Sequence, residues 1–106
     1  MMTRLFLEHE YLQQVRDVIK ETYPEAVVWA YGSRVDGSEK TAHGGSDLDL
    51  CVVTFGEEDG DIFRLREAFN ESNIPFLIDI FEYERLPQSF QEEINQKSVV
   101  IYESGT

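Results

Sequence analysis

The sequence has very little cysteine, because its 106 residues include only Cys51. A single cysteine excludes a disulfide within the chain and a zinc site built from several thiolates. We expect Cys51 to be a small buried residue of the core, as free cysteines commonly are. Such cysteine usage agrees with the reducing environment of the cytoplasm.

Long hydrophobic runs are also missing. The first ten residues, MMTRLFLEHE, contain no apolar run long enough for a signal peptide. No segment approaches the roughly 20 apolar residues that a membrane-spanning helix needs. We therefore expect a cytoplasmic protein that does not associate with membranes.

Positive charge is scarce, with 9 lysines and arginines against 21 aspartates and glutamates, for a formal net charge of −12. A surface this acidic repels phosphate, so we expect no direct binding to nucleic acid. The same charge favours a basic protein partner, whose approach it would steer. A hydrophobic content of 42% over 106 residues predicts one folded domain spanning residues 1–106.

Periodicity predicts alternating helices and strands. Apolar residues recur at helical spacing over 8–22 and 62–71, and Pro87 can occupy the first position of a last helix that Phe90 and Ile94 pack down. Short apolar segments rich in strand formers predict strands at 26–31, 48–53, 76–81 and 98–103. This order predicts an α/β domain with a small mixed sheet, helices packed against one face, and acidic residues at the sheet's edge.

The first candidate site residues follow the strand AVVWAY, which ends at Gly32 and Ser33. Glycine permits a close approach of the backbone to a ligand, and a strand-to-helix turn directs N–H groups toward a phosphate. Arg34 could add charge-assisted contacts to that phosphate. A tight turn with a serine cap would explain the same residues without a ligand.

Three aspartates form the second candidate group. Asp47 and Asp49 alternate at the start of the strand LDLCVV, so they share one face and lie roughly 7 Å apart. Asp79 interrupts the apolar segment FLIDIF, where burying an unpaired carboxylate is costly. If these strands are neighbours, the three acids match a two-metal site for phosphoryl or nucleotidyl transfer. The alternatives are a loop cap for Asp47, a solvated Asp49, and a salt bridge or hydrogen bond for Asp79.

Together these motifs resemble a known family. The order Gly-Ser, loop, Asp-x-Asp and later strand aspartate, over residues 26–83, resembles the DNA polymerase β-like nucleotidyltransferase superfamily. The segments YGSRVDG, SDLDLCVV and LIDIF resemble its small bacterial members, the minimal nucleotidyltransferases (MNT), which form toxin–antitoxin pairs with HEPN-domain proteins. Two features differ from that family: Asp36 stands where a basic residue is common, and the loop over 38–45, which we expect to be mobile, is longer than usual.

The resemblance implies a nucleotidyltransferase-fold domain that moves AMP from ATP to a hydroxyl group, namely a tyrosine of a HEPN ribonuclease toxin bound as a hetero-oligomer. Its catalytic residues and ligands to two Mg²⁺ ions would be Asp47, Asp49 and Asp79, and its nucleotide-binding residues Gly32, Ser33, Arg34 and Ser46. One alternative is a non-catalytic antitoxin that silences its partner by binding. Another is an adenylyltransferase for small molecules of the aminoglycoside type, which would require a helical domain that this chain is too short to supply.

Overall fold

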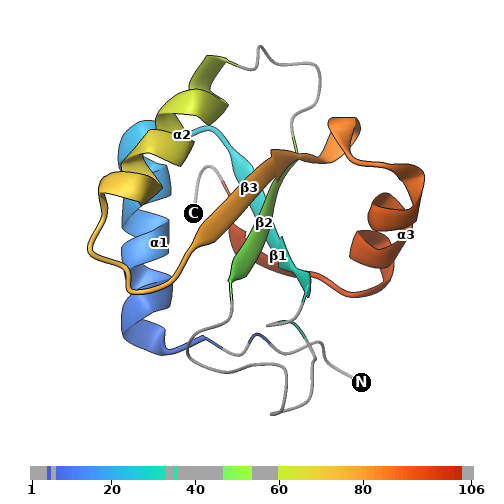
Figure 1. Cartoon of the computed structure of the whole chain (residues 1–106), viewed down its shortest axis with the longest axis horizontal. Helices are drawn as coiled ribbons and strands as arrows, with labels where there is room; N and C mark the ends of the chain where they lie inside the picture. The colour runs from blue at the N-terminus through green and yellow to red at the C-terminus, as the bar shows by residue number, and fades with distance from the viewer. Residues whose placement is uncertain (1–4, 6, 33–34, 36–46, 54–59, 104–106) are drawn as a thin grey trace.

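The computed structural model describes residues 5, 7–32, 35, 47–53 and 60–103 of the chain. Figure 1 shows three α-helices around a small sheet. The predicted order of helices and strands is confirmed, with most boundaries within two residues. In chain order the elements are α1 (His9–Thr22), β1 (Val27–Tyr31), β2 (Leu48–Val53), α2 (Gly60–Glu71), β3 (Ile78–Glu82), the 3₁₀ turn η2 (Tyr83–Arg85), α3 (Gln88–Gln96) and β4 (Val99–Tyr102).

The four strands form one mixed sheet in the order β3-β2-β1-β4. Strand β1 pairs antiparallel with both β2 and β4, whereas β2 pairs parallel with β3. A parallel pair needs a crossover connection, and α2 supplies it between β2 and β3. Because β2 lies inside the sheet with both faces covered, five of its six residues are buried, and Asp49 is the exception. The predicted α/β class and mixed sheet are confirmed.

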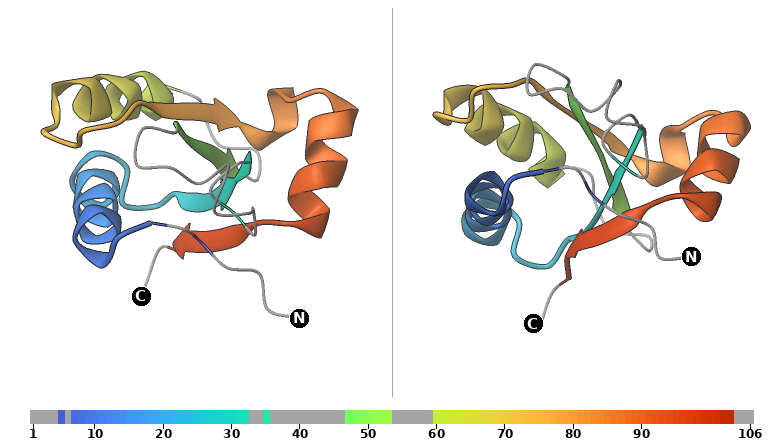
Figure 2. Two further views of the ribbon diagram at one scale, coloured as in Figure 1. Left: turned by 60° about the horizontal axis from the view of Figure 1, so that its bottom comes forward. Right: turned by 90° about the horizontal axis from the view of Figure 1, so that it is seen from below.

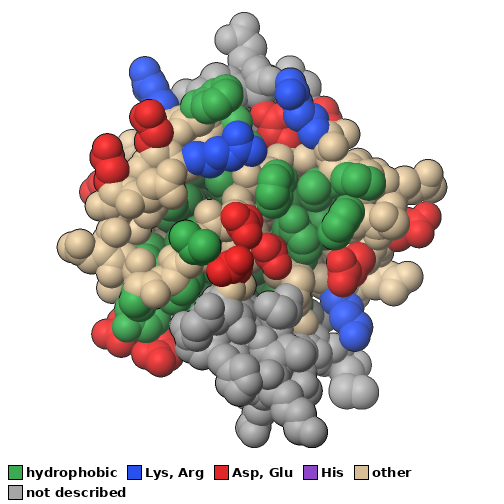
Figure 3. Space-filling model, in the orientation of Figure 1, with side chains coloured by type: hydrophobic (Ala, Val, Ile, Leu, Met, Phe, Trp, Pro, Cys, Tyr) green, Lys and Arg blue, Asp and Glu red, His purple; other side chains and the backbone are tan. Residues whose placement is uncertain are grey.

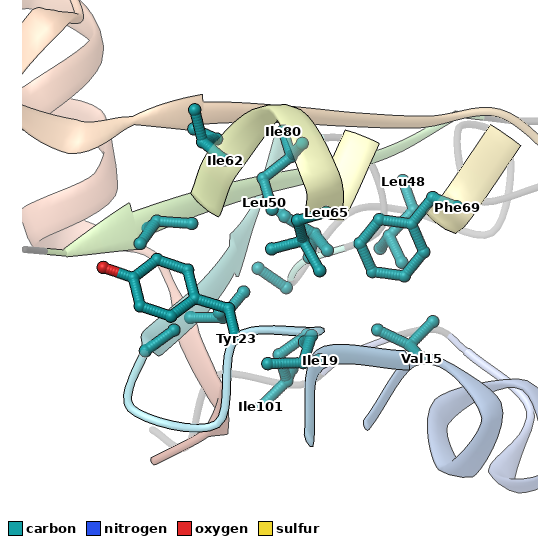
Figure 4. Close-up of a cluster of buried hydrophobic side chains, with 14 of the residues drawn as sticks. Val15, Ile19, Tyr23, Leu48, Leu50, Ile62, Leu65, Phe69, Ile80 and Ile101 are labelled. Atoms are coloured by element: carbon teal, nitrogen blue, oxygen red, sulfur yellow. The ribbon is translucent and has the colours of Figure 1, made fainter. Parts of the chain in front are cut away.

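The main core lies between the sheet and the helices α1 and α2, as Figure 4 shows. Val15 and Ile19 form the buried stripe of α1. Leu65 and Phe69 belong to the corresponding stripe of α2, one helical turn apart. These stripes pack against the face of the sheet that carries Leu48, Leu50, Val52, Ile80 and Ile101.

The prediction that all helices pack on one face is wrong. Figure 2 shows α3 on the opposite side of the sheet from α1 and α2. A second, smaller core lies there, formed by Tyr31, Cys51 and Ile94 with partly buried neighbours such as Trp29. Trp29 and Tyr31 of β1 and Cys51 of β2 are apolar on this face, so a lone helix can bury them. The expected burial of Cys51 is confirmed.

Two details of α3 also differ from the prediction. Pro87 occupies the N-cap position and not the predicted first helical position, because its backbone (ψ 150°) is not helical and α3 begins at Gln88. Ile94 is fully buried, but Phe90 is 47% exposed and does not pack the helix down. Instead, Gln91 Nε2 donates to the Tyr83 carbonyl and Tyr83 Oη donates to Asn95 Oδ1, so that η2 holds α3 in place.

Both edges of the sheet are covered by arginine. Arg16 of α1 donates from Nε to the Ile101 carbonyl of β4 at 2.8 Å. Arg66 of α2 donates from Nε and Nη2 to the Ile80 carbonyl of β3, at 3.1 and 2.9 Å. Occupying edge carbonyls in this way hinders pairing with a strand of another molecule. Among the described helices, none is both long and apolar enough to cross a membrane.

Candidate active site

The centre of the candidate site is a pair of aspartates on neighbouring strands. In the parallel pairing of β2 with β3, Asp49 lies directly opposite Asp79. Residues opposite each other in a sheet share a face, so both side chains lie on the face that α3 covers. The predicted adjacency of the second and third strands is therefore confirmed. No described cation forms an ion pair with Asp79, so within this part of the chain a salt bridge does not account for it.

Asp47 joins the two strand aspartates from the residue before β2. Its side chain is exposed, whereas those of Asp49 and Asp79 are partly buried. Burial, followed in order of size by the charges of Asp79, Asp47 and Glu93, raises the pKa of Asp49 to about 6. Asp79 and Asp47 therefore both act electrostatically on Asp49, and a positive charge placed beside Asp49 would be stabilised.

Gly32 lies against the same aspartate. It follows Tyr31, whose Cα partner across the sheet is Asp49, and it has a φ of +83°. A methyl group at Gly32 would overlap Asp49 Oδ2 and approach Asp49 Cγ to 3.2 Å. Glycine is thus required here for two reasons, the left-handed backbone and the space that the carboxylate occupies. The turn predicted to bind phosphate therefore begins beside the predicted metal ligands.

The remaining predicted nucleotide-binding residues lie outside the described residues. These are Ser33, Arg34 and Ser46, together with Asp36 and the loop over 38–45. Their positions relative to the acids stay predictions. Gly32 and Asp47 flank this region. Gly32 lies against the Asp49 carboxylate, and the charge of Asp47 helps to raise the pKa of Asp49.

Two groups at the site were not predicted from the sequence. Burial raises the pKa of the Tyr31 hydroxyl, as do the charges of Asp49, Cys51, Asp79 and Glu93. Glu93 belongs to α3, and its charge acts on both Tyr31 and Asp49. The sequence signal for Glu93 is its position beside the buried Ile94, but this signal is useful only once α3 is known to cover the face that carries the acids.

The acids fit a divalent cation by chemistry. Hard ions such as Mg²⁺ prefer carboxylate oxygens. The raised pKa of Asp49 shows that its surroundings disfavour the negative charge. Within the described ranges, no three Asp, Glu, His or Cys side chains are already as close as a bound ion would hold them. Like charges of this kind repel each other until a cation or protons offset them.

The surface around the acids is apolar on one side. Figure 3 shows acidic side chains gathered over the middle of the sheet, with hydrophobic side chains beside them and basic side chains farther along the same face. Exposed large hydrophobic residues near this part of the sheet include Phe81 of β3, which is 41% exposed. Asp47 is exposed and Asp49 and Asp79 are partly buried, and the exposed Phe81 on the strand of Asp79 belongs to a surface suited to contact with another molecule.

Comparison with known proteins supports a nucleotide-transfer site. Residues 13–106 match the family model described as "Polymerase beta, Nucleotidyltransferase". The chain is 37% identical over 103 residues to the "Probable protein adenylyltransferase MntA" of Haemophilus influenzae, covering 94% of this chain and 86% of that relative.

Solved structures of similar fold come from toxin–antitoxin complexes. One, a "toxin-antitoxin with AMP-PNP", has a TM-score of 0.65 and 14% identity, covering 89% of this chain and 74% of that one. Another, the "toxin-antitoxin MntA-HepT", has a TM-score of 0.62 and 8% identity, covering 92% and 74%. At these identities the likeness concerns the fold alone.

Proposed function

Because the chain belongs to the polymerase β-type nucleotidyltransferase family, as its motifs predicted, we propose that it transfers AMP from ATP to a hydroxyl group of a HEPN-domain protein. The relative from Haemophilus influenzae is named as a probable protein adenylyltransferase, and similar folds occur in MntA–HepT toxin–antitoxin complexes. The acceptor is a tyrosine of the partner, the two proteins form a hetero-oligomer, and the domain over residues 1–106 acts in the cytoplasm.

One observation carries the proposal: Asp49 lies between the predicted phosphate turn and the second acidic strand. It is opposite Asp79 in the sheet, and its Oδ2 occupies the space that a side chain at Gly32 would need. A triphosphate held at the turn would therefore have its charged oxygens next to the acids. This juxtaposition is costly without a cation and useful with one.

We assign the binding of two Mg²⁺ ions to Asp47, Asp49 and Asp79. When bound, such ions neutralise phosphate oxygens and lower the pKa of an attacking hydroxyl group. Gly32, Ser33, Arg34 and Ser46 hold the triphosphate, with Gly32 giving the backbone its close approach. The acceptor hydroxyl loses its proton to solvent and its oxygen forms a bond to the α-phosphorus. The bond from that phosphorus to the β-phosphate oxygen breaks, and pyrophosphate leaves with the bonding electrons.

The test uses the purified chain, a HEPN-domain protein that it binds, ATP and Mg²⁺. Intact mass spectrometry should show that the HEPN protein gains the mass of one or more AMP units. Asp49→Asn should abolish the gain, because asparagine keeps the size of the side chain but lacks the charge that holds a hard cation. Asp17→Asn is the matched control, since Asp17 is an exposed acid of α1 far from the site, and it should leave the gain unchanged.

A different result would favour the non-catalytic antitoxin. In that case, the wild-type chain and Asp49→Asn would silence the ribonuclease activity of the HEPN protein equally, and the partner's mass would not change. That outcome would contradict the transferase proposal.

A further inference from the structure

An apolar pocket of about 170 Å³ lies beside the acidic site, between α2, β3 and η2. We call it the Phe63–Phe81 pocket. Its apolar lining is Ile62, Phe63, Phe81 and Leu86, and its charged lining is Arg66 with the ion pair of Arg85 and Glu82. Phe63 is 69% exposed and Phe81 is 41% exposed. Keeping two phenyl rings this exposed on one small surface forgoes the free energy of burying them, roughly 25 cal/mol per Å². Paired exposed aromatic residues of this kind are typical of interaction sites.

Arg66 gives the pocket a fixed cationic wall. Its guanidinium carbon lies 5.9 Å from the ring centroids of both Phe63 and Phe81. The two hydrogen bonds to the Ile80 carbonyl hold the guanidinium at the edge of β3. A guanidinium stacks readily on aromatic faces and is weakly hydrated for a cation. A further ring entering the pocket would therefore meet two phenyl groups and the guanidinium of Arg66, while the second cation of the lining, Arg85, is paired with Glu82.

The pocket and the acids belong to one continuous surface. Phe81 follows Asp79 by two residues on β3, and in the register with β2 they lie opposite Cys51 and Asp49. Alternate strand residues share a face and lie roughly 7 Å apart. The pocket, through Phe81, therefore adjoins Asp79 along β3. In Figure 3 the acidic side chains adjoin the hydrophobic ones on this face.

The size of the pocket limits its occupant. Sites for drug-sized ligands usually enclose about 300–1,000 Å³, and the Phe63–Phe81 pocket offers about 170 Å³. It is too small for a nucleotide and suits a single large side chain. Interface energy is commonly concentrated in aromatic side chains that fill such pockets.

We propose that the Phe63–Phe81 pocket receives an aromatic side chain of the acceptor protein and so holds the neighbouring acceptor hydroxyl over Asp49 and Asp79. This inference rests on the proposed function for the identity of the acceptor protein. The chemistry requires a ring that can stack on Arg66, carried close to the residue that is modified. Docking and transfer are then separable, since the pocket contributes affinity and the acids contribute chemistry.

The test compares Phe81→Ala and Phe63→Ala with Phe90→Ala. Phe90 is a matched control, because it is 47% exposed and does not line the pocket. Binding to the HEPN-domain protein of the transfer assay is measured by isothermal titration calorimetry, and binding of a fluorescent ATP analogue is measured separately. Each pocket variant should raise the Kd for the HEPN protein at least about tenfold, as loss of an aromatic anchor does. The Kd for the nucleotide should not change, and Phe90→Ala should bind as the wild type does.

Thermal melts confirm folding, and Phe63→Ala keeps the test decisive if Phe81→Ala destabilises the sheet, since Phe63 is mostly exposed. Unchanged HEPN binding in Phe63→Ala would overturn the proposal, as would equal losses in Phe90→Ala. Weaker nucleotide binding in the pocket variants would identify the pocket as a nucleotide subsite. A change in self-association alone would identify it as a contact between copies of the chain. Either result would also overturn the docking proposal. If the wild type binds the HEPN protein but transfers no AMP, the pocket variants still decide the docking question independently.

Discussion

Replacing Asp49 by asparagine should make the protein more stable while it destroys transfer. Asp49 carries its charge in a partly buried position opposite Asp79. Burial and the neighbouring acids raise its pKa from 3.8 to about 6. A raised pKa means that the folded state disfavours the charged form, so ionised Asp49 destabilises the fold at neutral pH. Asparagine has nearly the same shape and carries no charge.

The size of the effect follows from the pKa. A rise of about two pKa units corresponds to roughly 3 kcal/mol. Because Asp49 remains partly open to solvent, screening reduces this value, and we expect a gain of about 1–2 kcal/mol for Asp49→Asn. For a domain of this size, such a gain raises the Tm by roughly 5–10 °C. Active sites commonly show this exchange of stability for function.

The sign of the pH dependence provides an internal control. Wild-type stability that comes from protonated Asp49 is fully present below pH about 4 and is lost as pH rises through about 6. The advantage of Asp49→Asn should therefore be largest above pH 6 and nearly absent at pH 4. The assay is urea unfolding in EDTA at pH 4, 5, 6 and 7, with the exposed Asp17→Asn as control. If Asp49→Asn is no more stable than the wild type at pH 7, the electrostatic reasoning is wrong. Added Mg²⁺ should raise the Tm of the wild type and leave that of Asp49→Asn unchanged.

Three further predictions concern the supporting structure. Gly32→Ala should lower stability by at least about 1–2 kcal/mol, because alanine disfavours the left-handed backbone and its methyl overlaps Asp49; circular dichroism melts would measure the loss, and an unchanged Tm would contradict it. Arg66→Ala should lower the free energy of unfolding by about 1–3 kcal/mol. It should also increase light scattering on heating, because it uncovers the edge of β3. Arg64→Ala, which replaces an exposed arginine of the same helix, should do neither. Cys51 should not react with a disulfide reagent at pH 8 until the protein unfolds, because burial raises the pKa of its thiol to about 12; rapid labelling of the native protein would contradict this.

Much of the fold could be predicted because its strands and helices obey simple periods. The segment LDLCVV has no polar residue after Asp49, as a central strand with both faces buried requires, and β2 covers the same residues as predicted. Asp49 and Asp79 could be predicted as site residues because they break this apolar pattern. A carboxylate within an apolar strand violates the local pattern, and such violations are expected at functional sites.

The face covered by α3 could not be predicted, because a helix of nine residues with one buried side chain, Ile94, carries little directional information. Which face it covers depends on η2, whose contacts with α3 through Tyr83 span 8 and 12 residues of sequence. Glu93 was missed for this reason, because its charge acts on Asp49 from α3. Tyr31 lies beside Asp49 through the antiparallel register of β1 with β2, which the sequence pattern does not specify.

Apolar residues outside the period of their element are the sequence signal that was not used. In α2 the buried stripe runs through Ile62, Leu65 and Phe69, and Phe63 lies outside it. In α3, Phe90 lies one turn before the buried Ile94 and is nevertheless exposed, so the period alone does not predict its exposure. Single exposed apolar side chains are common on protein surfaces, whereas Phe63 shares its pocket with a second exposed ring, Phe81. Because Phe63 lies beside Arg66 and Phe81 whereas Phe90 does not line that pocket, only the folded structure distinguishes a candidate docking residue from an isolated exposed ring.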